Sequence, residues 1–279
     1  MVMALLTTAH GQLAVTLRLA KSQYLAGEAV VAVVSITNHA GQDITFYSDG
    51  RTQWLDFILK DSRGDPVTPR GRSAFGKMTL KAGETLARQV NLAEHFILSE
   101  SGTYTAVALI HMPESSGAGF STNRVLFNQS PGTAYWTQKV GLPGKPGQIR
   151  EFRILNFNGD QTAQIYAQVI DDKTGRNLRT FALGDVLMLR KPLVTVDKQQ
   201  RLHVMYLGTP SMWVHCQIDT DGQLVGREIH QRGGSGDPQL LTFPDGTVRV
   251  TNSIVYDPQA AEAAKAKIRK ASDRPAIGN

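Results

Sequence analysis

The chain of 279 residues contains a single cysteine, Cys216, so no disulfide bond can form within it. Val214 and Ile218 alternate with this cysteine along a strand-like segment, which predicts a buried structural thiol and not a nucleophile. Long hydrophobic runs are also missing, because the longest, residues 29–34, is far shorter than the ~20 apolar residues that a membrane-spanning helix needs. We therefore expect a globular protein without covalent crosslinks and without a transmembrane segment.

Concentrated positive charge is absent, although the formal net charge is +6. The basic residues are spread along the chain and form no long block of like charge. Binding to nucleic acid needs a basic face with interleaved aromatic residues. The sequence therefore predicts no nucleic-acid partner.

Catalytic motifs are absent as well. The chain has no Gly-x-Ser-x-Gly and no His-Glu-x-x-His motif. Glycine clusters at 117–119 and 233–236 lack the Lys-Ser/Thr ending and the following helix of a phosphate-binding loop. We predict that the protein is not an enzyme and uses no cofactor. A hydrolase whose site is assembled from scattered loops stays open as an alternative.

Short β-strand patterns separated by turns fill residues 13–129. Apolar and polar residues alternate from Leu13 to Leu19, and turn signals recur along the rest of the segment, which predicts a β-sandwich. Gly102-Thr-Tyr104 opens a late strand, as in a tyrosine corner, where the tyrosine hydroxyl bonds to the backbone upstream. The alternative for Tyr104 is an ordinary buried tyrosine.

Five segments carry a resemblance to a known family: 33–38 (Val-Val-Ser-Ile-Thr-Asn), 44–46, 57–64, 80–84 (Leu-Lys-Ala-Gly-Glu) and 102–104. Their order resembles the Ig-like fold of the bacterial intracellular proteinase inhibitor family. The resemblance covers residues 13–129, less than half of the chain. It implies an Ig-like Greek-key sandwich and a protein-binding or scaffold module. It places no inhibitory loop on particular residues.

The remaining segments differ from this domain in composition. Residues 1–12 are a signal-like remnant or a disordered tail, and residues 130–148 are rich in proline and glycine, which predicts a linker. Residues 149–257 form a duplicated antiparallel β-repeat domain, and residues 258–279 are an Ala/Lys-rich helix and tail. If the start codon lies further upstream, the protein is extracytoplasmic (periplasmic or secreted); otherwise it is cytoplasmic.

The repeat is read from two pairs of matching segments. Residues 166–178 match 213–224, and residues 192–204 match 238–250, at offsets of 47 and 46 residues. A period of this size is typical of a propeller blade, but about two and a half units cannot close a propeller, which needs at least ~4 blades. An open sheet, a small sandwich and a fragment completed by a second chain all fit. We favour a compact meander of antiparallel strands.

One turn in this domain mimics a calcium loop. Asp219, Asp221 and Glu228 occupy three of the ligand positions, and Gly222 has the position of the invariant glycine. Gln217 stands at the first ligand position, however, and both flanks are strand-like. We therefore favour a hairpin turn in which Gly222 supplies the backbone conformation, with calcium as the weaker alternative.

Three histidines lie in the same domain: His203, His215 and His230. Their spacing matches no metal-binding motif. His215 lies opposite to Cys216 on its strand, beside Trp213 and Gln217, and this face is a possible ligand surface. The alternative is that the histidines are exposed or satisfied by ordinary hydrogen bonds.

These observations favour a non-catalytic extracytoplasmic binding or structural module that recognises a protein or a cell-envelope component. A protease-inhibitor-like protein acting through loops of the N-terminal domain is the first alternative, and a hydrolase is the second. The sequence leaves the oligomeric state open.

Overall fold

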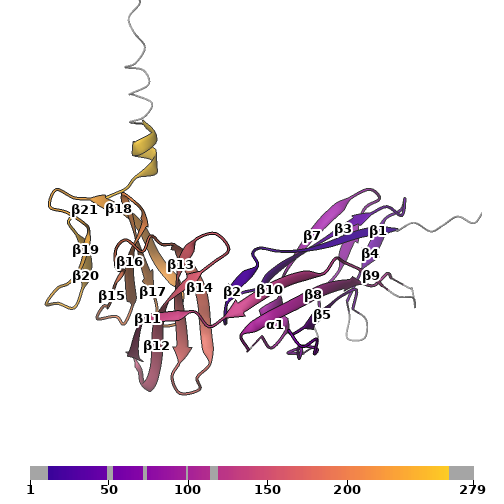
Figure 1. The fold of residues 1–279 in the computed structure, drawn as a ribbon, viewed down its shortest axis with the longest axis horizontal. Coiled ribbons are helices and arrows are strands. Elements are labelled where there is room, and N and C mark those ends of the chain that lie inside the picture. Colours follow the sequence, from indigo (N-terminus) through magenta and orange to yellow (C-terminus); the bar gives the residue numbers. More distant parts are fainter. Residues whose placement is uncertain (1–11, 49–52, 72–73, 99, 114–118, 264–279) are drawn as a thin grey trace, which may run out of the picture. The chain divides into compact units, whose positions relative to one another are not determined.

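The computed structural model describes residues 12–48, 53–71, 74–98, 100–113 and 119–263 (Figure 1). The chain divides into two compact units, Met1–Gly132 and Thr133–Asn279, which we call unit 1 and unit 2. Strands make up most of both units, so the all-β fold class is confirmed. In the described part of the chain, no helix is long and apolar enough to cross a membrane.

Unit 1 contains two main sheets and one small pair of strands. The first sheet has the order β1 (Leu13–Leu19), β3 (Val31–Asn38), β7 (Thr85–Asn91). The second has the order β2 (Gln23–Leu25), β10 (Val125–Ser130), β8 (Gly102–Ile110), β5 (Leu55–Lys60), with β9 (Phe120–Ser121) also paired to β8. The small pair is β4 (Ile44–Phe46) with β6 (Met78–Leu80). Only β2 and β10 pair in parallel among the described strands.

Alternation along the strands builds the core of unit 1. Every second residue of β3 and of β5 is buried, as expected for strands with one face in a core. The buried faces of both sheets contribute to one hydrophobic cluster, which includes Val34, Phe57 and Phe127. Unit 1 therefore has the packing of a β-sandwich.

The tyrosine corner predicted at Tyr104 is present. The Tyr104 hydroxyl donates a 2.7 Å hydrogen bond to the backbone carbonyl of Glu100, while its ring stacks on Phe127. The short helix α1 (Leu92–His95) precedes this corner and is capped by the side chain of Asn91. The corner joins the segment before β8 to the core, so it stabilises the crossover between the two sheets.

Unit 2 contains two antiparallel meanders and a hairpin. The first sheet has the order β11 (Thr133–Leu142), β12 (Lys145–Asn158), β13 (Ala163–Asp171), β14 (Asn177–Asp185). The second has the order β15 (Leu193–Val196), β16 (Leu202–Thr209), β17 (Met212–Ile218), β18 (Leu224–Arg232), β21 (Ser253–Val255). The hairpin is β19 (Gln239–Thr242) with β20 (Val248–Thr251). Both sheets contribute to one hydrophobic core, which includes Ile154, Val169 and Cys216.

The expected linker at 130–148 is wrong, because this segment forms most of the β11–β12 hairpin. Gly144, with φ +71°, lies in the tight turn of that hairpin. Pro146 and Gly147 lie where the pairing shifts, between Lys145 and Ile149, so the missing N–H of the proline breaks no regular ladder position. Because β11 is an edge strand, it also tolerates glycine.

The two pairs of matching segments adopt equivalent structures. Residues 166–178 and 213–224 lie in the hairpins β13–β14 and β17–β18, and residues 192–204 and 238–250 lie in β15–β16 and β19–β20. A duplication as their origin stays a prediction. Residues 258–263 are helical, as expected, and the rest of the predicted helix and tail lies outside the described residues, as do residues 1–11 of the predicted N-terminal tail.

Candidate functional site

Three histidines gather on one face of the second sheet of unit 2. Strands β16, β17 and β18 are neighbours, and their residues alternate between the core of unit 2 and the opposite face. Val204 and Cys216 lie in the core, so His203 and His215 lie on the opposite face. Each of these two side chains, and that of His230, is almost completely buried. The histidines therefore form a covered row and not an exposed surface.

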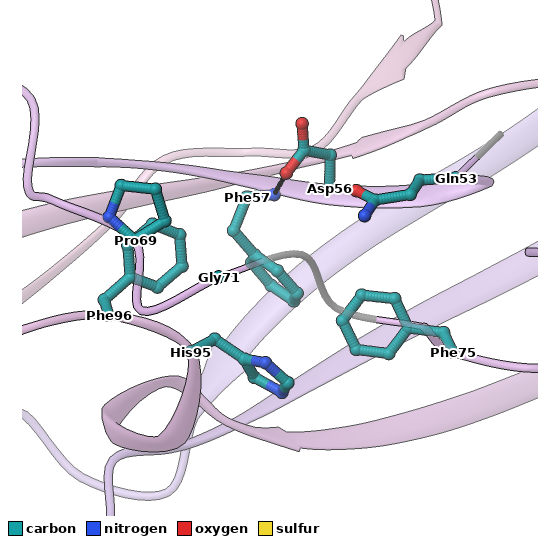
Figure 2. A pocket seen from close by; sticks show the side chains of 8 residues that line it. All are labelled: Gln53, Asp56, Phe57, Pro69, Gly71, Phe75, His95 and Phe96. Carbon is teal, nitrogen blue, oxygen red and sulfur yellow. Dashed lines mark hydrogen bonds between the residues drawn. The ribbon is translucent and has the colours of Figure 1, made fainter. Parts of the chain in front are cut away.

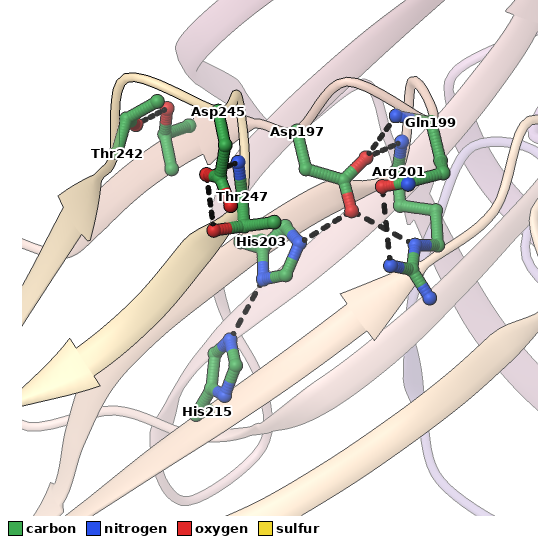
Figure 3. Close-up of polar contacts among 9 residues, drawn as sticks. Asp197, Gln199, Arg201, His203, His215, Thr242, Asp245 and Thr247 are labelled. Atoms are coloured by element: carbon green, nitrogen blue, oxygen red, sulfur yellow. Dashed lines mark hydrogen bonds and ion pairs between the residues drawn. The ribbon is translucent and has the colours of Figure 1, made fainter.

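A hydrogen-bonded chain runs through the first half of this row (Figure 3). Asp197 Oδ2 lies 3.2 Å from His203 Nε2, and His203 Nδ1 lies 3.0 Å from His215 Nε2. The two imidazole rings stack with their centroids 5.3 Å apart. We call Asp197, His203 and His215 the relay.

Asp197 is held in place by its own turn. Its Oδ1 atom accepts hydrogen bonds from the backbone N–H groups of Gln199 and Arg201, and its Oδ2 atom accepts one from Arg201 Nε at 2.9 Å. Burial raises the pKa of Asp197, but hydrogen bonds from Arg201 and His203 outweigh burial and leave the pKa below its ordinary value. Asp197 is therefore an ionised acceptor at the head of the relay.

The charge on Asp197 determines the tautomers that follow. Burial lowers the pKa of His203, so its ring is neutral near pH 7 and carries one proton. A carboxylate only accepts, so that proton lies on Nε2 and Nδ1 is an acceptor. His215 then donates through Nε2 to His203, and a neutral His215 has a bare lone pair at Nδ1. Burial and, to a smaller extent, the neighbouring His203 together lower the pKa of His215 to about 4, so the neutral ring is the stable form near pH 7.

The second half of the row brings one carboxylate between two imidazole nitrogens. Glu228 Oε2 lies 3.6 Å from His215 Nδ1 and 3.5 Å from His230 Nε2. Neither nitrogen has a hydrogen-bond partner among the described residues, and both are buried. The Glu228 side chain is 52% exposed, so it closes the row at the solvent boundary. Burial also lowers the pKa of His230.

Ser253 on β21 completes the contacts of His230. Its hydroxyl oxygen lies 3.2 Å from His230 Nδ1. Ser253, His230 and Glu228 thus follow one another in the order of a hydrolytic triad, although the 3.5 Å step from His230 to Glu228 is longer than a good hydrogen bond. Cys216 lies on the other face of the sheet, and burial raises the pKa of its thiol to about 11, so it is no nucleophile here.

The predicted ligand surface of Trp213, His215 and Gln217 is not an open surface. Trp213 is only 4% exposed and packs with Met205 and Leu207, against which Leu240 of the β19–β20 hairpin also packs. This hairpin covers part of the sheet face, and Trp213 and His215 are both buried. Gln217 is half-buried.

The calcium alternative fails on geometry. Asp219 Oδ1 accepts the backbone N–H groups of Asp221 and Gln223, so its carboxylate stabilises the β17–β18 turn. Gly222 has φ +79°, as the hairpin interpretation predicted. Glu228 lies opposite His215 in the strand pairing. His215 is four residues before Asp219, which is about 13 Å at the spacing of residues in a strand. The three predicted ligands cannot hold one ion.

Unit 1 carries two further candidate sites. An open groove of about 570 Å³ crosses the outer face of β5 and β8 and is lined by Ile58, Val107 and Leu109, with Lys60 and Arg124 beside them. A smaller cavity of about 40 Å³ lies among the rings of Phe57, Phe75, His95 and Phe96 (Figure 2). Gln53, Asp56, Pro69 and Gly71 complete its lining. The smaller cavity has room for only a few water molecules, so it is no substrate pocket.

Comparisons with known proteins offer no assignment: no protein-family model matches the chain, and a search of curated proteins finds no match.

Proposed function

We propose that this protein is a non-catalytic binding protein that recognises an extended, acidic segment of a protein partner through the outer groove of unit 1. The observation that supports this proposal is an apolar row left open on a sheet face. Ile58 on β5 pairs directly with Val107 on β8 and is 44% exposed, and Leu109 follows on the same face. Isolated exposed apolar residues are ordinary, but a contiguous row in a groove is typical of an interaction site.

The charges around the row favour an acidic partner. Lys60 and Arg124 line the groove and form no ion pair among the described residues, whereas Arg63 is paired with Asp61. The groove therefore has an excess of positive charge, in a chain with a net charge of +6. Complementary charge of this kind increases the rate of association and selects partners.

The Ig-like resemblance of residues 13–129 belongs to the same proposal. Two sheets around one core and the Tyr104 corner support an Ig-like sandwich, a fold that commonly presents a sheet face or loops to a partner. Export from the cytoplasm, which would give the partner access, stays a prediction.

The test is a selection of peptides from a random display library on the immobilised full chain. We expect enriched peptides to combine acidic and apolar residues and to bind the Ile58→Glu variant at least ten-fold more weakly. Val225, which is 51% exposed on β18 of unit 2, provides the control, because Val225→Glu should leave binding unchanged. Peptides that bind both variants equally, or a glycan array that binds when peptides do not, would overturn the proposal.

The first alternative, inhibition of a protease through loops of unit 1, is tested on a panel of serine proteases. Inhibition that survives Ile58→Glu would favour the loops over the groove. The second alternative, a hydrolase, has one specific observation in its favour, the order Ser253–His230–Glu228. It requires hydrolysis of p-nitrophenyl acetate above that of buffer, and loss of that activity in Ser253→Ala.

A further inference from the structure

We propose that His215, Glu228 and His230 form a binding site for one divalent transition-metal ion of the zinc class. The ligand atoms are His215 Nδ1, one Glu228 carboxylate oxygen and His230 Nε2, which all lie within 4.8 Å of one another. This site lies in unit 2 and is independent of the groove proposed in unit 1.

Two buried nitrogens that form no hydrogen bond are the first argument. The great majority of buried polar atoms in folded proteins have a hydrogen-bond partner, because a buried polar atom without one is costly. His215 Nδ1 and His230 Nε2 have none among the described residues, and both lie beside the same carboxylate. Two lone pairs and one carboxylate around a common point create a site for a cation.

The relay is the second argument. Metal-bound histidines usually donate their other ring N–H to a carboxylate, a carbonyl or a similar acceptor, which holds the ring and its tautomer in place. His215 meets this condition through the 3.0 Å contact between its Nε2 atom and His203 Nδ1, since His203 uses its own N–H at Nε2 for Asp197. The lone pair of His215 is thereby held at Nδ1, the atom that faces Glu228.

Ser253 has the equivalent position for the second ligand. Its oxygen lies 3.2 Å from His230 Nδ1 and can accept a hydrogen bond from an N–H at that nitrogen. His230 Nε2 is then the unprotonated atom, and it faces Glu228 at 3.5 Å. Both histidines thus have a partner for one nitrogen and present the other to the carboxylate.

The spacing and the atom types define the class of ion. Ligand atoms of a tetrahedral zinc site, at bond lengths near 2.1 Å, are about 3.4 Å apart. The two nitrogen–oxygen distances, 3.6 and 3.5 Å, are close to that value, and the exposed Glu228 side chain can rotate to adjust them. Imidazole is a ligand of zinc, copper, nickel and iron, whereas calcium and magnesium prefer oxygen.

The competing explanation is a proton in place of a metal. A protonated His215 or His230 would form an ordinary ion pair with Glu228, and the cluster would then be structural. The two explanations differ in one respect, because only the metal site predicts saturable binding of an ion that depends on all three side chains.

The experiment is calorimetric titration of the untagged full chain with ZnCl2, with MgCl2 and CaCl2 in parallel. We expect one zinc ion per chain and no heat from magnesium or calcium. Glu228→Gln and His230→Gln should each weaken zinc binding at least ten-fold, whereas His39→Gln, an exposed histidine of unit 1, should not change it. Glu228→Gln alters an exposed side chain, so the variant should fold, which circular dichroism can verify.

The relay is tested with the same titration and with a spectrum. Asp197→Asn should weaken zinc binding by about 10–100-fold, the usual effect of removing a partner behind a metal ligand. Co²⁺ should give visible absorption bands in the wild-type chain that are lost in His230→Gln. Zinc binding that is absent, exceeds one ion per chain, or is unchanged in Glu228→Gln would overturn the proposal.

Discussion

Replacing Gly222 with alanine should destabilise unit 2 far more than the same change at Gly175, the glycine at the matching position of the other repeat hairpin. Both glycines have positive φ, +79° and +66°. Alanine in this region costs about 1–2 kcal/mol. A Cβ at Gly222 would also lie 2.9 Å from the Arg179 Cβ and 3.4 Å from Val169, whereas a Cβ at Gly175 would have no neighbour within 4 Å.

The difference between the two variants isolates the steric clash. Forcing extra atoms into a packed region costs about 1–3 kcal/mol. We therefore expect a loss of unfolding free energy of about 2–5 kcal/mol in Gly222→Ala and about 1–2 kcal/mol in Gly175→Ala. Urea denaturation of the full chain, followed by tryptophan fluorescence, measures both; Trp136 and Trp213 report on unit 2, and Trp54 reports on unit 1. Equal losses in the two variants would refute the packing that we describe around Gly222.

Three further predictions concern hydrogen bonds. Tyr104→Phe should cost about 1 kcal/mol or more, because the Glu100 carbonyl loses its donor, and an unchanged urea midpoint would reduce Tyr104 to a core residue. Asp219→Ala should lower the free energy of unfolding by about 1–2 kcal/mol, because two hydrogen bonds to the backbone are lost, and Asp221→Ala should lower it much less. Millimolar calcium should shift the melting temperature of neither variant. The hydrogen bonds of Asp197 keep its folded-state pKa below the unfolded value of about 4. The stability that its charge contributes is therefore present above pH 4 and is lost as the pH falls. In urea unfolding followed between pH 6 and 2, Asp197→Asn should lose less unfolding free energy than the wild type over this range.

Local signals in the sequence predicted local structure well. The alternation in residues 13–19 follows directly from one buried sheet face. The turn at Asp219–Gly222 follows from residue types that bond to their own backbone. The linker prediction failed for an equally local reason. Glycine and proline at a hairpin turn and a bulge have the same composition as a flexible connection, and only the pairing partner distinguishes them.

The candidate metal site depends on strand register, which the sequence does not state. His203, His215 and His230 lie on three successive strands, and their spacing of 12 and 15 residues matches no motif. The signal in the sequence that points to the site is Glu228-Ile-His230, because Glu228 and His230 lie on the same face of their strand. His215 lies on the same face of the neighbouring strand, directly opposite Glu228. The sequence analysis names Glu228 only in the weaker calcium alternative, together with Asp219 and Asp221.

The most direct test of the account is a crystal of the untagged protein grown with zinc and measured at wavelengths on both sides of the zinc absorption edge. We predict one anomalous difference peak in unit 2, about 2.1 Å from His215 Nδ1, His230 Nε2 and a Glu228 oxygen. A well-ordered unit 2 without such a peak, or with a direct hydrogen bond between Glu228 and either histidine at saturating zinc, would contradict the proposed metal site.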